Sequence, residues 1–119
     1  LGDYRGMAHT LKRQGVIMWR SGDVHGAVVK YEEALGFYER AHYIQGQGDT
    51  LSRICTGYIE LGEMVKLQEA IASSEKLMDK IPYQMTKSEL ADSIKKGRNW
   101  LLGWELNQDN EESGTFSTS

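Results

Sequence analysis

Residue types that could carry chemistry are few in this chain of 119 residues, and they form no catalytic pattern. The three histidines, His9, His25 and His42, lack the His-Glu-x-x-His spacing or any similar spacing that a metal site on one helix needs. We therefore expect each to be an exposed or hydrogen-bonded surface residue. The single cysteine, Cys55, lies within a helical pattern, so a buried core role is favoured over a reactive thiolate.

The other polar groupings have structural explanations. Three pairs of carboxylates occur at Glu32-Glu33, Glu60/Glu63 and Glu111-Glu112. Such pairs on an amphipathic helix or in a polar tail are usually solvated, and nothing separates their pKa values. Gly46-Gln47-Gly48 has no strand before it, so it is not a nucleotide-binding loop. The sequence thus predicts a protein that is not an enzyme and holds no cofactor and no metal.

Charge and composition exclude several classes of protein. Fourteen Lys and Arg residues against 17 Asp and Glu residues give a formal net charge of -3, without the basic surface of a nucleic-acid binder. One cysteine cannot form an internal disulfide, and apolar runs such as residues 16–19 are too short to span a membrane. No targeting signal is visible from Leu1 onward. We expect an intracellular, cytoplasmic domain, either whole or cut from a longer protein.

The elements that position these residues are predicted to be helices. Apolar and small residues recur every three or four positions, which places them along one stripe of a helix, and no alternating β pattern occurs. Five sets of this kind run from Tyr4 to Met18, Val24 to Ala41, Leu51 to Leu61, Leu67 to Ile81 and Leu90 to Trp104. The sequence therefore predicts an all-α fold of five helices.

The first helix boundaries are marked by glycine and aspartate. Asp3 can cap the first helix by accepting from free backbone amides of its first turn. Residues 21–23 (Ser-Gly-Asp) suit a tight turn between antiparallel helices. Residues 46–49 are expected to separate the second helix from the third, with Asp49 as the cap. Residues 62–63 (Gly-Glu) turn the third helix into the fourth.

The last boundaries are set by proline and polar residues. Pro82 ends the fourth helix, because proline lacks the backbone N–H and its ring clashes within a helix. Residues 86–89 (Thr-Lys-Ser-Glu) read as a capping box that opens the fifth helix. Residues 107–119 are polar and aperiodic, so they are expected to be a flexible tail.

The segment from Ala8 to Leu35 resembles one tetratricopeptide repeat, a pair of antiparallel helices. The residues that carry the resemblance are Gly15, Met18, Gly22, Asp23, Ala27, Tyr31 and Ala34. A second, weaker copy has Cys55 and Tyr58 at matching positions before its turn glycine, Gly62. After that turn it departs, with Leu67 where alanine is usual and Ile71 where an aromatic is usual.

The turn glycines Gly22 and Gly62 lie 40 residues apart, so the chain resembles the longer variety of this repeat, found in scaffolds and bacterial peptide-sensing regulators. Helix two is then expected to run on through Ala41 towards Tyr43. The resemblance implies a helix-hairpin array in a single domain, 1–106, with repeat one at 3–44, repeat two at 48–81 and a capping helix at 86–106.

The resemblance also implies a function. In this family the first helix of each repeat lines a groove that binds a peptide or a partner helix, often in scaffolds and adaptors. Carried over by position, the groove residues are His9, Lys12, Val16, Trp19, Asp49, Ser52, Arg53, Thr56 and Ile59. Lys12, Val16 and Trp19 together would suit a peptide with an apolar anchor and an acidic group. Val16 stands where the chaperone-tail clamp has asparagine, so that specificity is not expected.

Several alternatives stay open. Trp19 could instead serve in packing, and the domain could be a sensor that repacks or self-associates when a partner binds. An enzyme or a lipid-binding helical domain is the third alternative. Helix five widens its apolar arc at Trp100, Leu102 and Leu106, which suits either a cap or a second binding face for a partner or another copy of the chain.

Overall fold

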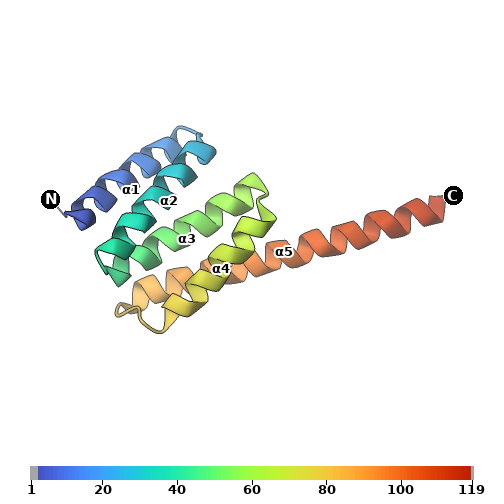
Figure 1. The fold of residues 1–119 in the computed structure, drawn as a ribbon. Helices are drawn as coiled ribbons and strands as arrows, with labels where there is room; N and C mark the ends of the chain where they lie inside the picture. The colour runs from blue at the N-terminus through green and yellow to red at the C-terminus, as the bar shows by residue number, and fades with distance from the viewer. Residues whose placement is uncertain (1–2, 119) are drawn as a thin grey trace.

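The computed structural model describes the backbone of residues 3–118 and the side chains of residues 3–106. Within this part of the chain five α-helices follow one another and no strand occurs. They are α1 (Tyr4–Arg20), α2 (Val24–Arg40), α3 (Ile44–Leu61), α4 (Met64–Met78) and α5 (Gln84–Thr118). Consecutive helices form hairpins that stack into an array (Figure 1). The predicted all-α fold is confirmed.

The helices begin at a regular interval along the chain. Their first residues are 4, 24, 44, 64 and 84, so one helix starts every 20 residues and one hairpin every 40. Asp3 caps α1 by accepting from the backbone amide of Gly6 at 3.0 Å, as the sequence predicts, and Asp23 caps α2 in the same way at 2.8 Å to Gly26. Gly62 ends α3 at φ 70°, a left-handed conformation that favours glycine.

The core lies between the hairpins. One buried cluster joins α2, α3, α4 and α5, and its most enclosed large side chains are Tyr31, Cys55, Leu67 and Leu90. Burial of Cys55 confirms its expected core role, and burial also raises the pKa of its thiol. A smaller buried cluster, Ala8 with Ala34 and Tyr38, joins α1 to α2. Small residues on α1 and α2 allow these two helices to approach closely.

The boundary between α2 and α3 differs from the sequence prediction. α2 ends at Arg40 rather than running towards Tyr43, and α3 begins at Ile44. Residues 46–49 therefore lie inside α3, so Asp49 is not a helix cap. The reason is packing: a Cβ atom added at Gly46 would lie 2.5 Å from Cδ1 of the buried Tyr38 ring. Gly46 is small so that α3 can cross this ring.

Two glycine substitutions should therefore have opposite effects on stability. Gly46→Ala is expected to lower the free energy of unfolding by at least about 1 kcal/mol, because the Tyr38 ring is enclosed and has no room to move. Gly36→Ala, in α2, should raise it by about 0.5–1 kcal/mol, because nothing lies within 4 Å of the added methyl group. Urea denaturation followed by circular dichroism measures both; equal effects would contradict this packing.

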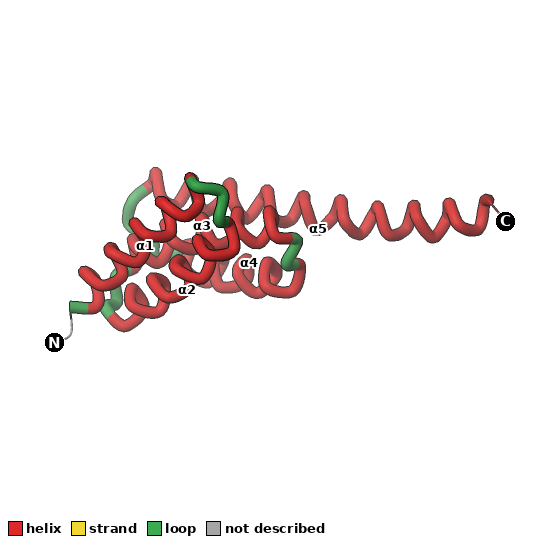
Figure 2. The backbone as a smooth tube through the Cα atoms, turned by 90° about the horizontal axis from the view of Figure 1, so that it is seen from above, coloured by secondary structure: helices red, strands yellow, loops and turns green. Residues whose placement is uncertain are grey.

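α5 also differs from the prediction. It begins at Gln84, and Thr86 is not its cap: this side chain is buried and its hydroxyl accepts a hydrogen bond from the Gln45 amide on α3. The backbone continues as helix to Thr118, where the sequence predicts a tail from residue 107. No proline follows Pro82 to stop the helix. Figures 1 and 2 show the C-terminal part of α5 projecting beyond the other helices. No helix among the described residues has the length and apolarity needed to cross a membrane.

Candidate protein-interaction groove

A pocket of about 290 Å³ lies between α1 and α3, and we call it the α1–α3 pocket. It is lined by Val16, Trp19 and Arg20 of α1, Tyr31 of α2, and Arg53 and Thr56 of α3. Val16 and Trp19 are partly buried against the main core, and Tyr31 is only 1% exposed. The apolar part of the pocket is therefore held in place by the core.

Two guanidinium groups give this pocket its charge. Arg20 lies in the last turn of α1, and the Arg53 guanidinium carbon lies 6.0 Å from the centre of the Tyr31 ring. Arginine combines a permanent positive charge with a planar fork of donors that suits a carboxylate. The α1–α3 pocket can thus accept one large apolar side chain next to an acidic group.

Lys12, the cation expected to face a ligand, forms an ion pair within the protein. Its Nζ lies 2.8 Å from Oδ2 of Asp49, and this ion pair links α1 to α3. Arg53 Nε lies 3.7 Å from the other oxygen of the same carboxylate. One carboxylate, that of Asp49, therefore pairs with Lys12 of α1 and with Arg53 of α3. These pairs lie beside the groove and help to position the Arg53 side chain.

His9, also predicted to line the groove, is partly buried against the rings of Tyr38 and Tyr43 instead. Its Nδ1 shares a hydrogen bond of 2.6 Å with the Tyr38 hydroxyl, and its ring meets Tyr43 edge-on. Burial lowers the pKa of His9, and the charges of Lys12, Arg5 and Arg13 lower it further, while Asp3 opposes them. The neutral imidazole is thus the form that the fold prefers.

This preference predicts a pH dependence of stability. The pKa of His9 is lower in the folded chain than its usual value of about 6.5, so protonation favours the unfolded chain. The contribution of neutral His9 to the free energy of unfolding is fully present above about pH 6.5. It is lost as the pH falls through the pKa of His9 in the folded chain. We expect the thermal midpoint to fall between pH 7.5 and 5.5, and to fall less in His9→Gln. An identical pH dependence in both proteins would show that His9 does not contribute.

A second, more polar pocket of about 340 Å³ lies between α3 and α5, and we call it the α3–α5 pocket. The residues that line it are Asp49, Ser52, Arg53, Glu89, Asp92, Ser93 and Lys96. The hydroxyls of Ser52 and Ser93 are 2.6 Å apart and join the two helices at this pocket. Arg53 lines both pockets.

The structure brings together part of the predicted groove. The predicted residues in the α1–α3 pocket are Val16, Trp19, Arg53 and Thr56, and those in the α3–α5 pocket are Asp49, Ser52 and Arg53. His9, Lys12 and Ile59 line neither of these two pockets, and Ile59 is partly buried against the core. The sequence did not predict that Arg20 and Tyr31 line the first pocket. It also did not predict the residues of α5 that line the second, which are Glu89, Asp92, Ser93 and Lys96. Extending the 40-residue spacing of Gly22 and Gly62 would have placed another groove-lining helix after Pro82.

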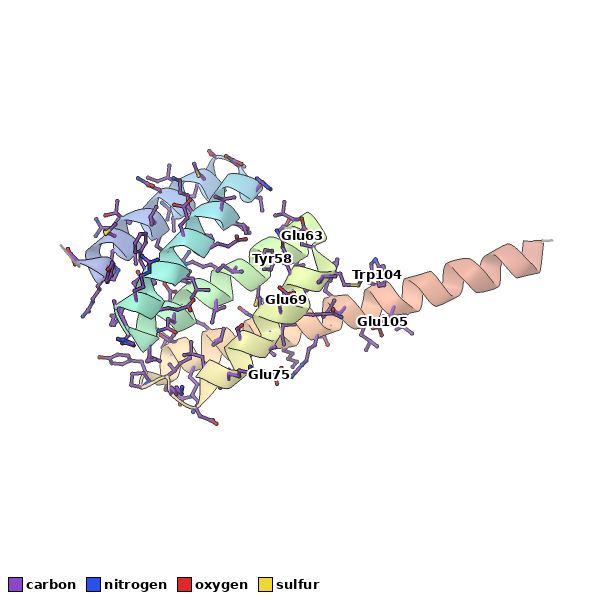
Figure 3. The ribbon with its side chains drawn as sticks, in the orientation of Figure 1. Tyr58, Glu63, Glu69, Glu75, Trp104 and Glu105 are labelled. Atoms are coloured by element: carbon purple, nitrogen blue, oxygen red, sulfur yellow. The ribbon has the colours of Figure 1, made fainter. Side chains whose placement is uncertain are left out.

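The three residues of the predicted second face on helix five differ in burial. Trp100 is partly buried against the main core, whereas Leu102 and Leu106 are 55% and 54% exposed. Figure 3 shows Trp104 and Glu105 on α5, in the view near the start of α4, which Glu63 precedes. Leu102 and Leu106 alone remain as an exposed apolar pair from the predicted set.

Neither a metal site in the described part of the chain nor a known relative points to another function. Among the described residues, no group of three or more His, Cys, Asp or Glu side chains could hold a metal ion. No family model matches the chain, and no curated protein and no solved structure matches it. The two pockets and their shared arginine are therefore the basis for assigning a function.

Proposed function

We propose that this chain is a protein-interaction module that binds a peptide, or a segment of a partner, in the groove between α1 and α3. The observation that carries the proposal is the α1–α3 pocket, in which the apolar side chains of Val16 and Trp19 lie beside two guanidiniums. A partner would insert one large apolar side chain there and place a carboxylate against Arg20 and Arg53. No bond is made or broken, so the module would act as a scaffold or adaptor.

We also propose that the hairpins are tetratricopeptide repeats of the longer variety. The regular start of a helix every 20 residues supports this assignment, because it gives a unit of 40 residues. Further support comes from burial of the small and aromatic residues that carry the resemblance, namely Gly15, Ala27, Tyr31 and Ala34. In arrays of this kind, the first helices of successive units line one face.

Selection from a phage-displayed library of random peptides, each about 12 residues long, tests the proposed function. The immobilised wild-type chain should enrich peptides that contain one large apolar residue with Asp or Glu nearby. A variant with Trp19→Ala and Arg53→Glu should lose this enrichment, because it removes both the apolar wall and a cation. A control variant with Leu102→Ser changes an exposed residue on α5 and should select the same peptides as the wild type.

The outcomes separate the alternatives clearly. Loss of enrichment in the groove variant alone supports binding at the α1–α3 pocket. No enrichment by the wild-type chain, or equal enrichment by wild type and groove variant, would overturn the proposal. Loss in the Leu102→Ser control alone would assign binding to the exposed apolar pair on α5 instead.

A further inference from the structure

We infer that the groove continues across α3 onto α5, and that its peptide carries a basic residue on the α5 side of its apolar anchor. This inference rests on the proposed function and adds the order of charges along the bound peptide. The α1–α3 and α3–α5 pockets share Arg53, so a chain that leaves the first pocket past this side chain enters the second.

α5 is fixed as the third wall of this groove. It starts 40 residues after α3, just as α3 starts 40 residues after α1, so it occupies the place of a first helix in the array. Leu90 is fully buried, and the buried Ser93 bonds to Ser52 of α3. These contacts hold the neighbouring side chains of α5 against α3, where they line the α3–α5 pocket.

The charges at the two ends of the groove have opposite signs. Arg20 lies at the α1 end and Arg53 lies between the two pockets, while Glu89 and Asp92 lie on the α5 wall with one cation, Lys96. Asp49 is paired with Lys12 and Arg53, whereas no ion pair among residues 3–106 includes Glu89 or Asp92. Because both carboxylates are exposed beside a pocket, they are available to a cationic side chain.

The spacing of the helices sets the distance between the two charges on the peptide. Neighbouring packed helices lie roughly 8–10 Å apart, and an extended peptide rises about 3.3 Å per residue. An apolar anchor in the α1–α3 pocket and a side chain in the α3–α5 pocket are then separated by about two to four residues. The occupant is thus an extended segment with an acidic residue near its anchor and a Lys or Arg farther along.

Peptide selection with a charge-reversed wall tests this inference. The same random library is selected on the wild type and on a variant with Glu89→Lys and Asp92→Lys. The wild type should enrich Lys or Arg about two to four residues from the anchor. The variant should enrich Asp or Glu at that position instead. A peptide selected by the wild type should bind the charge-reversed variant at least about fivefold more weakly than the wild type, as measured by fluorescence anisotropy. Its affinity for a neutral variant with Glu89→Gln and Asp92→Asn should lie between these two affinities.

Each result decides between the two proposals. Both wall positions are exposed, so the variants should keep the helical circular dichroism of the wild type. Peptides with the apolar anchor but no charge preference, unchanged by the reversal, would overturn the inference about α5 and leave the proposed function standing. If the wild type selects nothing that the Trp19→Ala and Arg53→Glu variant does not also select, both proposals are overturned.

Discussion

Leu67→Ala is expected to lower the free energy of unfolding by about 2–5 kcal/mol, one of the two largest effects that we predict. Leu67 is fully buried on α4, and its Cδ1 lies 3.2 Å from the position that a Cβ atom would take on Gly97 of α5. Removing this side chain leaves a cavity where α4 and α5 meet the main core, so both transfer energy and packing are lost. Urea denaturation followed by far-ultraviolet circular dichroism measures the change.

A matched substitution shows whether burial is the cause. Leu102→Ala removes the same atoms from a side chain that is 55% exposed on α5. Its effect on the free energy of unfolding should stay within about 0.5 kcal/mol. If the two substitutions destabilised the chain equally, the α4–α5 contact described here would be wrong.

The second large effect concerns binding. In a variant with Arg20→Glu and Arg53→Glu, a peptide selected by the wild type should bind at least about 30-fold more weakly, because two attractive charges become repulsive. Isothermal titration calorimetry at low and moderate salt measures the loss. The wild-type affinity should itself decrease as salt is added, because these arginine contacts are partly exposed to solvent.

A control variant has the same net charge as the arginine variant but carries its two charge reversals outside the groove. Lys66→Glu with Lys76→Glu reverses two exposed cations on α4, which line neither pocket. This control should bind within about twofold of the wild type. A loss as large as that of the arginine variant would show that binding follows overall charge rather than the groove.

Much of the fold could be predicted from the sequence because its signals are local. The apolar period shows five helices, Asp3 shows the start of the first, and Gly22 with Gly62 shows the interval between hairpins. Each of these features depends on residues within one or two turns of the chain. Val16, Trp19 and Arg53 could be predicted to line one groove for a similar reason, since the resemblance to a repeat is carried by residues close to them in the chain, and the structure places all three in one pocket.

The remaining features depend on contacts between helices that are distant in the sequence. Gly46 resembles a hinge residue in the sequence, and only the Tyr38 ring explains why it lies inside α3. Lys12 resembles a free cation until Asp49, 37 residues later, is placed beside it. Glu89, Asp92 and Lys96 of α5 line a pocket only because α3 lies next to them, and this contact joins residues about 40 positions apart.

The location of the bound peptide tests the central claim most directly. Chemical-shift changes in the ¹H–¹⁵N spectrum of the chain, on adding a selected peptide, would map the contact residue by residue. We predict the largest changes at the Trp19 indole and at the amides of Val16, Arg53 and Thr56. Largest changes on the exposed face of α4, around Glu69, or at Leu102 and Leu106 would contradict the groove as the binding site.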